Sequence, residues 1–523
     1  MTRSKSYLLF LTLAAAVTVG CGSDTAPGGA RACKPLATAS CYTGSGSTAG
    51  VGACSRGTMV CSADGSAFGE CSGSVLPSFQ GCSTGVDTDC DGKAACSGEH
   101  RWSYGLLGQG YKVPVGVYVD KNGDIAVAGD FEGTIDLGGG ELKADTSLMM
   151  RDMWVGKIDA NGKHLWSKRI GNAADQMLEE LASDRDGNVI LTGWSETPAE
   201  FEGVTLQESF TLKLGPGGEV LWSIPHSGYL GVDGEGNVIL AGGFTGSFKY
   251  EGKELTSVGE RDAYIAKFDP SGKLLWVLSA GGAGSEYLHH VEADGAGNIV
   301  VAGQYSGVAD LGGGPMPPGA PNGNESAFVA KFDKDGAFLW SRSFVGQSVR
   351  ARFLSADKAG NTVFGGMMYG SVDFGGGHVE DGPPAFLTKL GPNGETLFSE
   401  GYMSDVTAGS TSYAHVGNVA FDAEDNMLVL GLFHTAIHLG GGVSLKAAGD
   451  AVFVAKYDAL GKIIWGMTPG GGQVIDANSG ISADPLGGVV VTGLYGASAL
   501  DFGGGILYGN PGQPEIFLAH LAP

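Results

Sequence analysis

Short apolar runs alternate with tight polar turns from about residue 100 to the end of the chain. The stretch from Trp276 to Trp340 contains four such runs, "WVLSAGG", "YLHHVEAD", "NIVVAG" and "AFVAKF", before the next Trp. Turns such as Asp294–Asn298 within this stretch and Asp269–Gly272 before it place glycine where a short hairpin needs a positive φ. Runs rich in β-branched and aromatic residues between such turns are typical of strands. The pattern therefore predicts an all-β chain of short strands that alternate in direction.

The four-run unit occurs seven times. Its first run carries an aromatic residue at an equivalent position, and successive copies lie 54 to 67 residues apart. Repetition of a four-stranded unit predicts a β-propeller, here with seven blades over residues 100–523. The seven aromatic positions are Trp102, Trp166, Trp222, Trp276, Trp340, Phe398 and Trp465.

The end of the chain interrupts this unit. The last segment, "EIFLAHLAP", stops after the third run, and the run "HRWSYGL" around Trp102 has no unit before it. The last unit thus lacks its fourth strand, and the Trp102 run can supply that strand. We therefore predict that the Trp102 strand pairs with Ile516–Leu521 and closes the ring, which would remove two exposed sheet edges.

Several residues repeat with the unit, and we interpret them as structural. A Trp at a fixed strand position is expected in the blade core rather than in a sugar-binding platform. A repeated lysine is expected to pair with an acidic residue of the blade, for example Asp184 or Asp294. The "DLGGG" phrases follow the second run, where the backbone must bend, and no helix follows them to bind phosphate. The repeated lysines are Lys157, Lys213, Lys267, Lys331, Lys389 and Lys456, with His520 in the last unit.

The phrases "DAYIAKFDPSGKLLW", "SAFVAKFDKDGAFLW" and "DAVFVAKYDALGKIIW" resemble the bacterial β-propeller repeat called SBBP. The resemblance covers roughly residues 102–523, although the second and third units lack the GGG phrase. It implies an exported propeller and no particular enzyme activity.

The N-terminus has a short basic region, an apolar stretch "YLLFLTLAAAVTV" and then "TVGC". This resembles a bacterial lipoprotein signal over residues 1–21, in which Cys21 is lipidated and becomes the mature N-terminus. The resemblance implies a lipid anchor in the outer membrane or at the cell surface, since Gly22 follows the cysteine. Thr18 departs from the leucine preferred at that position, so a plain secretory signal and a secreted protein remain the alternative. A flexible linker is expected over residues 22–32.

All the other cysteines lie between residues 33 and 98, where large apolar residues are few. An even number of cysteines in an exported chain predicts a disulfide-stabilised module, with the pairing left open. The run from "CYTGSGS" to "GVDTDCDG" resembles a cysteine-rich module in exported proteins of myxobacteria. The cysteines are Cys33, Cys41, Cys54, Cys61, Cys71, Cys82, Cys90 and Cys96.

Alternate carboxylates at Asp87, Asp89 and Asp91 precede Gly92, as in the first half of a calcium loop. The second half does not match, because Gly98 stands at the twelfth position and Glu99 comes one residue late. A looser calcium site and a solvated acidic turn held by Cys90 are the two interpretations.

Composition and charge exclude several classes of protein and partner. Glycine accounts for 92 of 523 residues without a collagen period, and 43% of residues are hydrophobic, which argues against disorder. The net charge is −24, and almost all of it lies beyond residue 100. Such an acidic surface disfavours nucleic acid as a partner and suits a soluble monomer outside the cell.

The sequence favours a non-catalytic scaffold that binds a protein or glycan ligand. It has no G-x-S-x-G elbow and no HExxH helix, since His434 and His438 lie in a strand pattern. The alternative is an extracellular propeller enzyme that acts on polysaccharide or peptide. A cluster of His, Arg, Tyr and acidic side chains at one channel mouth would favour that enzyme.

Binding residues are expected on connections that vary between units. Two of the four connections vary, and both emerge on one face of the ring; we call this the variable-loop face. The candidates near its centre are Met150, Arg151, His226, Tyr287, His289, Tyr402 and Tyr413.

Overall fold

The computed structural model is all-β over the residues it describes, and its chain divides into two compact units. One unit comprises residues 1–50 and 55–76, and the other comprises 51–54 and 77–523. No helix in the described part is long and apolar enough to cross a membrane. The structure describes residues 32–78, 80, 86–90, 92–93, 96–145, 150–320, 325–375, 378–379, 385–402, 414–471, 474–476, 480–496, 499–510 and 512–523. Outside these ranges lie the predicted signal, most of the linker, Cys21, Cys82, Asp91 and Tyr413.

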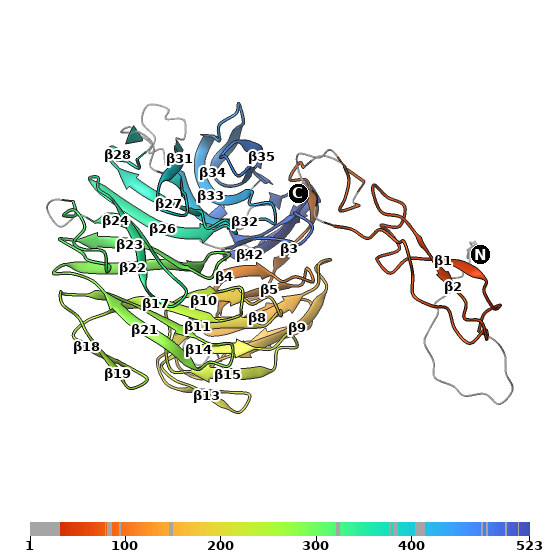
Figure 1. Ribbon diagram of the computed structural model, residues 1–523, viewed down its shortest axis with the longest axis horizontal. Coiled ribbons are helices and arrows are strands. Elements are labelled where there is room, and N and C mark those ends of the chain that lie inside the picture. Colours follow the sequence, from red (N-terminus) through yellow and green to blue (C-terminus); the bar gives the residue numbers. More distant parts are fainter. Residues whose placement is uncertain are drawn as a thin grey trace, which may run out of the picture. The chain divides into compact units, whose positions relative to one another are not determined.

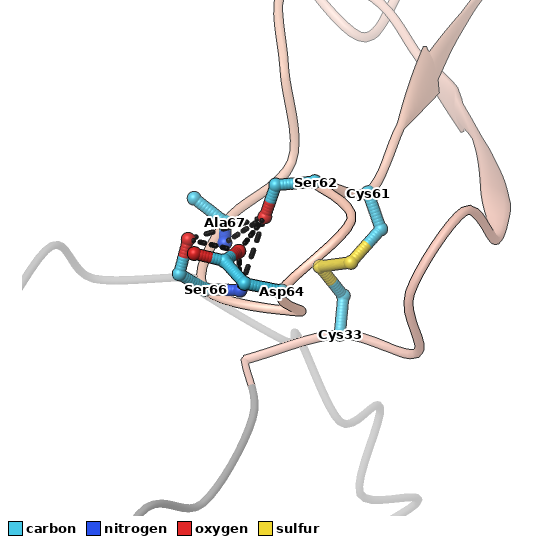
Figure 2. Close-up of a disulfide and its surroundings, with 6 residues drawn as sticks. All are labelled: Cys33, Cys61, Ser62, Asp64, Ser66 and Ala67. Carbon is cyan, nitrogen blue, oxygen red and sulfur yellow. Dashed lines mark hydrogen bonds between the residues drawn. A yellow bond between two sulfur atoms is a disulfide. The ribbon is translucent and has the colours of Figure 1, made fainter.

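The smaller unit is held mainly by disulfides. Its two strands, β1 (Thr38–Cys41) and β2 (Gly57–Val60), form a short antiparallel pair. Disulfides Cys33–Cys61 and Cys41–Cys71 close loops of 28 and 30 residues. Figure 2 shows the first of them beside a turn in which hydroxyls of Ser62 and Ser66 donate to Asp64. These hydrogen bonds lower the pKa of Asp64 to about 2. Covalent links thus stabilise a segment that has little apolar surface to bury.

The larger unit begins with a third disulfide, Cys54–Cys90. Cys96 is also disulfide-bonded. Disulfides in this N-terminal region are consistent with an exported protein.

Six four-stranded antiparallel sheets fill most of the larger unit, counted over the described residues. In each, chain order is also spatial order, so every sheet is a meander. Their strands are β4 (Lys112–Val119), β5 (Ile125–Phe131), β8 (Asp152–Ile158) and β9 (His164–Ile170); β10 (Gln176–Ser183), β11 (Val189–Ser195), β14 (Ser209–Leu214) and β15 (Val220–Ile224); β16 (Tyr229–Val232), β17 (Val238–Phe244), β20 (Asp262–Phe268) and β21 (Leu274–Ala280); β22 (Ser285–Ala293), β23 (Ile299–Ser306), β24 (Ser326–Phe332) and β25 (Phe338–Phe344); β26 (Ser348–Ala356), β27 (Thr362–Tyr369), β30 (Ala385–Leu390) and β31 (Thr396–Tyr402); and β32 (Ala414–Phe421), β33 (Met427–His438), β34 (Ser444–Tyr457) and β35 (Ile463–Met467).

A further sheet joins the two ends of this unit, and we call it the joining sheet. It contains β37 (Val474–Asp476), β38 (Ile481–Ala483), β39 (Val489–Tyr495) and β42 (Glu515–Leu521), all from the end of the chain. Its outer strand is β3 (His100–Leu106), which pairs antiparallel with β42 and places Trp102 opposite His520. The predicted pairing between the Trp102 strand and Ile516–Leu521 is therefore present.

The sheets follow one another in chain order (Figure 1), and their first strands contact each other in cyclic order. The order is β4, β10, β16, β22, β26, β32, β38 and again β4. Apolar clusters lie between successive sheets, as between β33–β34 and β39–β42. The arrangement is propeller-like, as the repeat predicted.

The repeated lysines pair with the aspartate that ends the first strand of the same sheet. The Nζ–Oδ2 distances are 2.7–3.2 Å, and both side chains of every pair are buried. The predicted lysine–acid pairing is thus confirmed. Each Nζ also donates to a turn carbonyl of the next sheet, as Lys157 does to Gly187 at 3.1 Å. The lysine therefore links neighbouring sheets as well as strands of one sheet. The pairs are Lys157–Asp120, Lys213–Asp184, Lys267–Asp233, Lys331–Asp294, Lys389–Asp357 and Lys456–Asp422.

The repeated tryptophans lie between sheets rather than in the centre of the blade core. The indole of Trp166 donates to the carbonyl of Pro216 at 2.8 Å, in a turn of the following sheet. Its ring packs under Gly218, where a Cβ would come within 2.9 Å. Most of these rings are half-buried, and Trp465 is buried. Their role is structural, as expected, but they fasten one sheet to the next.

The GGG phrases form hairpin turns. Asp136 accepts hydrogen bonds from the backbone N–H of Gly138 and Gly140, which have φ values of 94° and 112°. The middle glycine, Gly139, lies against the ring of His164, and a Cβ there would overlap that ring. Glycine is thus required for left-handed backbone and for close packing on the outer strand.

Candidate functional site

The connection between the second and third strands differs from sheet to sheet. It carries a two-stranded hairpin in five sheets of the described structure, whereas β33 and β34 simply extend. Large exposed apolar side chains lie on these connections, including Val258, Tyr369 and Tyr508 with 79%, 58% and 69% exposure. The variable-loop face therefore presents apolar contact surface. The hairpins are β6–β7 (Thr134–Asp136, Glu141–Lys143), β12–β13 (Ala199–Phe201, Val204–Leu206), β18–β19 (Ser247–Tyr250, Lys253–Thr256), β28–β29 (Val372–Asp373, His378–Val379) and β40–β41 (Leu500–Asp501, Ile506–Leu507), the last extended by β36 (Gly470–Gly471).

The predicted ligand residues do not form one cluster. Arg151 makes an ion pair with Asp175 at 2.7 Å, and Met150 beside it is half-buried. His226 stacks on Tyr250 with ring centroids 3.8 Å apart.

Two further candidates are also occupied by structural contacts. Arg261 lies over the ring of Tyr287 at 5.2 Å, and Tyr402 is buried. Of the predicted candidates in the described part, His289 alone lines the central cavity.

That cavity, of about 820 Å³, lies between the first strands of the seven sheets. Its lining is strongly asymmetric. Strands β10, β16, β22 and β26 contribute charged and aromatic side chains, whereas β4, β32 and β38 contribute mostly glycine, alanine, valine and serine. Positions that serve the fold repeat from sheet to sheet, as the Lys–Asp pairs do. The repeat that builds the fold therefore does not account for the unequal lining.

Regular β-bulges shape this wall. The register of the first strand shifts at equivalent places in β4, β10, β22, β26 and β32, five residues before the turn aspartate. A bulge leaves one residue unpaired and can redirect its side chain. The bulged residues all line the cavity, and they are Val115, Glu179, His289, Arg352 and Gly417.

Two carboxylates and a histidine form the inner cluster of the cavity. The Glu180 carboxylate accepts the backbone N–H of Leu230 at 2.8 Å. Burial raises the pKa of Glu180 to about 7, although His290 and that hydrogen bond oppose the rise. His290 lies 3.7 Å from Glu292. Burial lowers the pKa of His290, but the carboxylates of Glu292 and Glu180 outweigh it and raise the pKa overall. The charge of each of Glu180 and His290 therefore favours the ionised form of the other.

A second group lies toward the variable-loop face. The Tyr229 hydroxyl is 3.5 Å from Nδ1 of His289. The other ring nitrogen of His289 is buried without a hydrogen-bond partner among the described residues. Burial lowers the pKa of His289 and outweighs a side-chain hydrogen bond with Gln304, which raises it, while the charge of Arg352 adds to the lowering. Arg350 and Glu325, where β26 and β24 begin, pair at 3.3 Å.

These side chains can donate and accept hydrogen bonds around an aromatic surface. Acceptors are Glu180 and Glu292, donors include Arg352, and Tyr118 and Tyr229 supply ring faces. No group of three potential metal ligands occurs in the part of the chain that the structure describes. The arrangement suits a polar organic ligand, or proton transfer by groups that titrate near neutrality.

The aspartates considered for calcium have other contacts. Asp89 pairs with Arg101, and Asp87 accepts the N–H of Gly92 at 2.9 Å. Arg101 also reaches Asp484, which links this turn to the joining sheet.

Sequence reasoning missed Glu180, His290, Glu292 and Arg352. A signal was available, because all four stand between two and five residues before the aspartate that ends the first strand. Aligning the seven units on that aspartate shows charged residues where other units have glycine or alanine.

No protein-family model matches the chain. An uncharacterized WD repeat-containing protein of Acanthamoeba polyphaga mimivirus, L264, is 23% identical over 200 residues, which cover 30% of this chain. The match spans only 14% of that relative's length.

Solved structures match most of this chain, with low TM-scores. A protein from Lactobacillus plantarum matches with a TM-score of 0.38 and 12% identity, covering 78% of this chain and 99% of its own. Sqt1 from Chaetomium thermophilum has a TM-score of 0.37 and 8% identity, over 82% and 100%. Puromycin hydrolase has a TM-score of 0.34 and 13% identity, over 84% and 55%.

Proposed function

We propose that the chain is an exported, non-catalytic cell-envelope lipoprotein of the SBBP type. Its sheets form a closed seven-bladed propeller, and β3 completes the last blade. The propeller binds a protein or glycan ligand through its variable-loop face. Residues 1–21 direct export, and lipid on Cys21 anchors the chain in the outer membrane.

One observation carries this proposal. Repeated residues are used for the fold, as the Lys–Asp pairs and inter-sheet tryptophans are, while the residues that differ gather on the variable connections and the cavity wall. Function usually resides in variable loops held by a rigid frame. Exposed Tyr369 and Tyr508 suit this role, because tyrosine is frequent at protein interfaces.

The ring closure is supported by residues that stand in for a missing turn. The N–H of Ser97 donates to Pro523 at 2.8 Å, and the N–H of Ala522 donates to Glu99 at 2.7 Å. Gly98 lies under Trp465, where other sheets place the glycine of a continuous turn.

An enzyme acting on polysaccharide or peptide is the second candidate. His, Arg, Tyr and Glu side chains converge in one cavity, which is the feature expected of that alternative. Glu180 has a pKa of about 7 and is suited to act as an acid or a base at neutral pH.

Binding and catalysis can be separated with purified full-length protein. We expect capture of a cell-surface protein or an immobilised glycan to fall about tenfold in Tyr369→Ala/Tyr508→Ala. Leu460→Ala is the matched control, because Leu460 is 86% exposed in a turn that does not belong to the variable connections. Equal loss in both variants would contradict the assigned face. Release of cleavage products that stops in Glu180→Gln would favour the enzyme.

The anchor is tested by fractionating cells that express the wild type and Cys21→Ala. We expect the wild type in the membrane fraction and the variant in the soluble fraction. A wild-type protein found soluble, with an unmodified N-terminus, would contradict lipidation.

A further inference from the structure

We infer that the central cavity is a binding site for an uncharged oligosaccharide, whose rings pack on Tyr118 and Tyr229 and whose hydroxyls bond to Glu180, Glu292 and Arg352. The inference rests on the proposed binding role of the variable-loop face and names the ligand class for the cavity behind it.

The volume suits such a ligand. Small-molecule sites usually enclose roughly 300–1,000 Å³. The cavity of about 820 Å³ falls within that range, and it extends from Glu325 and Arg350, where β24 and β26 begin, to Val119 and Ala356, where β4 and β26 end. A short chain of sugar rings could therefore enter from the variable-loop face along the axis of the cavity.

The polar side chains of the cavity wall suit a ligand with several hydroxyl groups better than a ligand with one charged group. Glu180 and Glu292 accept hydrogen bonds, while Arg352 only donates. Arg350 and Glu325 neutralise each other at 3.3 Å, and His290 lies 3.7 Å from Glu292. A sugar hydroxyl both donates and accepts, so it can bridge such mixed groups.

Aromatic faces complete the match. Tyr118 of β4 is 37% exposed and lines the cavity, as does Tyr229 of β16. The C–H faces of a sugar ring are apolar and pack on such rings. The next β4 residue toward the cavity wall is Gly116, where an added Cβ would meet nothing closer than 3.5 Å. The wall therefore carries no side chain at the position next to Tyr118.

His289 adds a further polar group to the cavity wall, where its ring lies beside Tyr229 and Gln304.

The alternatives are charged ligands. An anionic oligosaccharide would have to enter a cavity that holds Glu179, Glu180, Glu292 and Glu325 against two arginines. A polycation could pair with the carboxylates, but it has no acceptor for Arg352, which forms no ion pair within the described structure. An uncharged ligand avoids both penalties.

The test is calorimetric titration of full-length protein with neutral gluco-, manno- and xylo-oligosaccharides, with oligogalacturonate and with oligolysine. We expect at least one neutral series to bind, and Tyr118→Ala and Glu180→Gln each to weaken it about tenfold. Leu460→Ala, in an exposed turn outside both the cavity and the variable connections, should leave affinity unchanged. Circular dichroism and the melting temperature would show that each variant is folded.

Failure to bind any neutral series, binding of a charged series alone, or equal affinity in wild type, Tyr118→Ala and Glu180→Gln would overturn the inference. These outcomes differ from failure of the proposed function, which shows as unchanged capture by Tyr369→Ala/Tyr508→Ala.

Discussion

Six sheets take their four strands from one continuous segment, whereas the joining sheet combines β3 with strands from the chain's end. Both kinds of sheet place the same side chains of the fourth strand against neighbouring turns. His164 lies over the middle glycine of its GGG turn, and His100 of β3 lies in the same way over Gly504. Trp102 donates to Ala160 of the next sheet at 2.9 Å, as Trp166 does to Pro216. The fourth strand therefore makes the same packing contacts whether or not a turn connects it to the third strand.

The two kinds of sheet differ at the position of the repeated lysine. Six sheets have a buried lysine paired with aspartate, while the joining sheet has His520 and Asp484 at 2.5 Å. Arg101 of β3 also contacts Asp484 at 3.3 Å. A histidine can become neutral, and a buried lysine cannot do so without a large pKa shift. The joining sheet should therefore tolerate loss of its aspartate better than the others.

The largest effect should follow removal of a buried charge partner. Asp422→Asn leaves Lys456 buried and unpaired, and we expect it to lower the free energy of unfolding by about 4 kcal/mol. Asp484→Asn should cost about 2 kcal/mol, since an imidazole, unlike a lysine amine, need not stay charged when its partner is lost. Denaturant unfolding of both variants measures the difference. Equal losses would remove the distinction between the sheets.

Removal of the repeated tryptophan should destabilise the joining sheet more than a sheet built from one continuous segment. Both rings are half-buried, so we expect Trp166→Ala to cost about 2 kcal/mol and Trp102→Ala about 3 kcal/mol. The excess arises because β3 has no turn to β42 and can separate, whereas β9 remains tethered by Asp159–Lys163. Hydrogen exchange should show faster exchange in β42 of Trp102→Ala than in β8 of Trp166→Ala. Similar exchange would mean that β3 does not depend on its tryptophan.

Glycine replacement should have a smaller effect. Gly139→Ala and Gly504→Ala each place a Cβ against a histidine ring, at an expected cost of about 1–2 kcal/mol. Gly46→Ala is a control, because its Cβ would meet nothing within 4 Å. Thermal melting should separate both variants from the control. A neutral Gly504→Ala would show that His100 is not packed on this turn.

The smallest effect concerns pH. Burial raises the pKa of Asp484, but the hydrogen bond from His520 and the charges of His520 and Arg101 outweigh it and lower the pKa overall. A depressed folded pKa stabilises the protein above the unfolded pKa, and this contribution is lost as pH falls through the folded value. The stability gap between wild type and Asp484→Asn/His520→Gln, which also removes the imidazole, should therefore shrink by about 1 kcal/mol between pH 6 and pH 3. A gap that grew toward acid pH would contradict this.

The sequence predicted most of the architecture because the fold residues repeat. The phrase ending at Trp276 specifies a strand, a glycine turn and an outer strand, and its truncation at Ile516–Leu521 located the partner of the Trp102 strand. The lysine pairs followed from burial, since a buried amine needs a partner.

The cavity residues were harder to predict, because a side chain's direction depends on a bulge that the local pattern does not encode. Glu180 and His290 look like surface residues of an amphipathic strand, and only the meeting of seven first strands encloses them. The loop candidates Arg151, His226 and Tyr402 failed to converge because each satisfies a local contact. Tests of the cavity and of the variable-loop face therefore need separate variants.

Crosslinking of β3 to β42 tests the central claim most directly. Ser103 lies opposite Ala519, so Ser103→Cys/Ala519→Cys should form a crosslink within one molecule, detected by peptide mass spectrometry, and should raise the melting temperature. Ser103→Cys/Ala330→Cys is the control, because Ala330 holds the equivalent position in another sheet. We predict an intramolecular crosslink in the first variant alone. A crosslink found only between molecules, or formed equally by the control, would contradict the account.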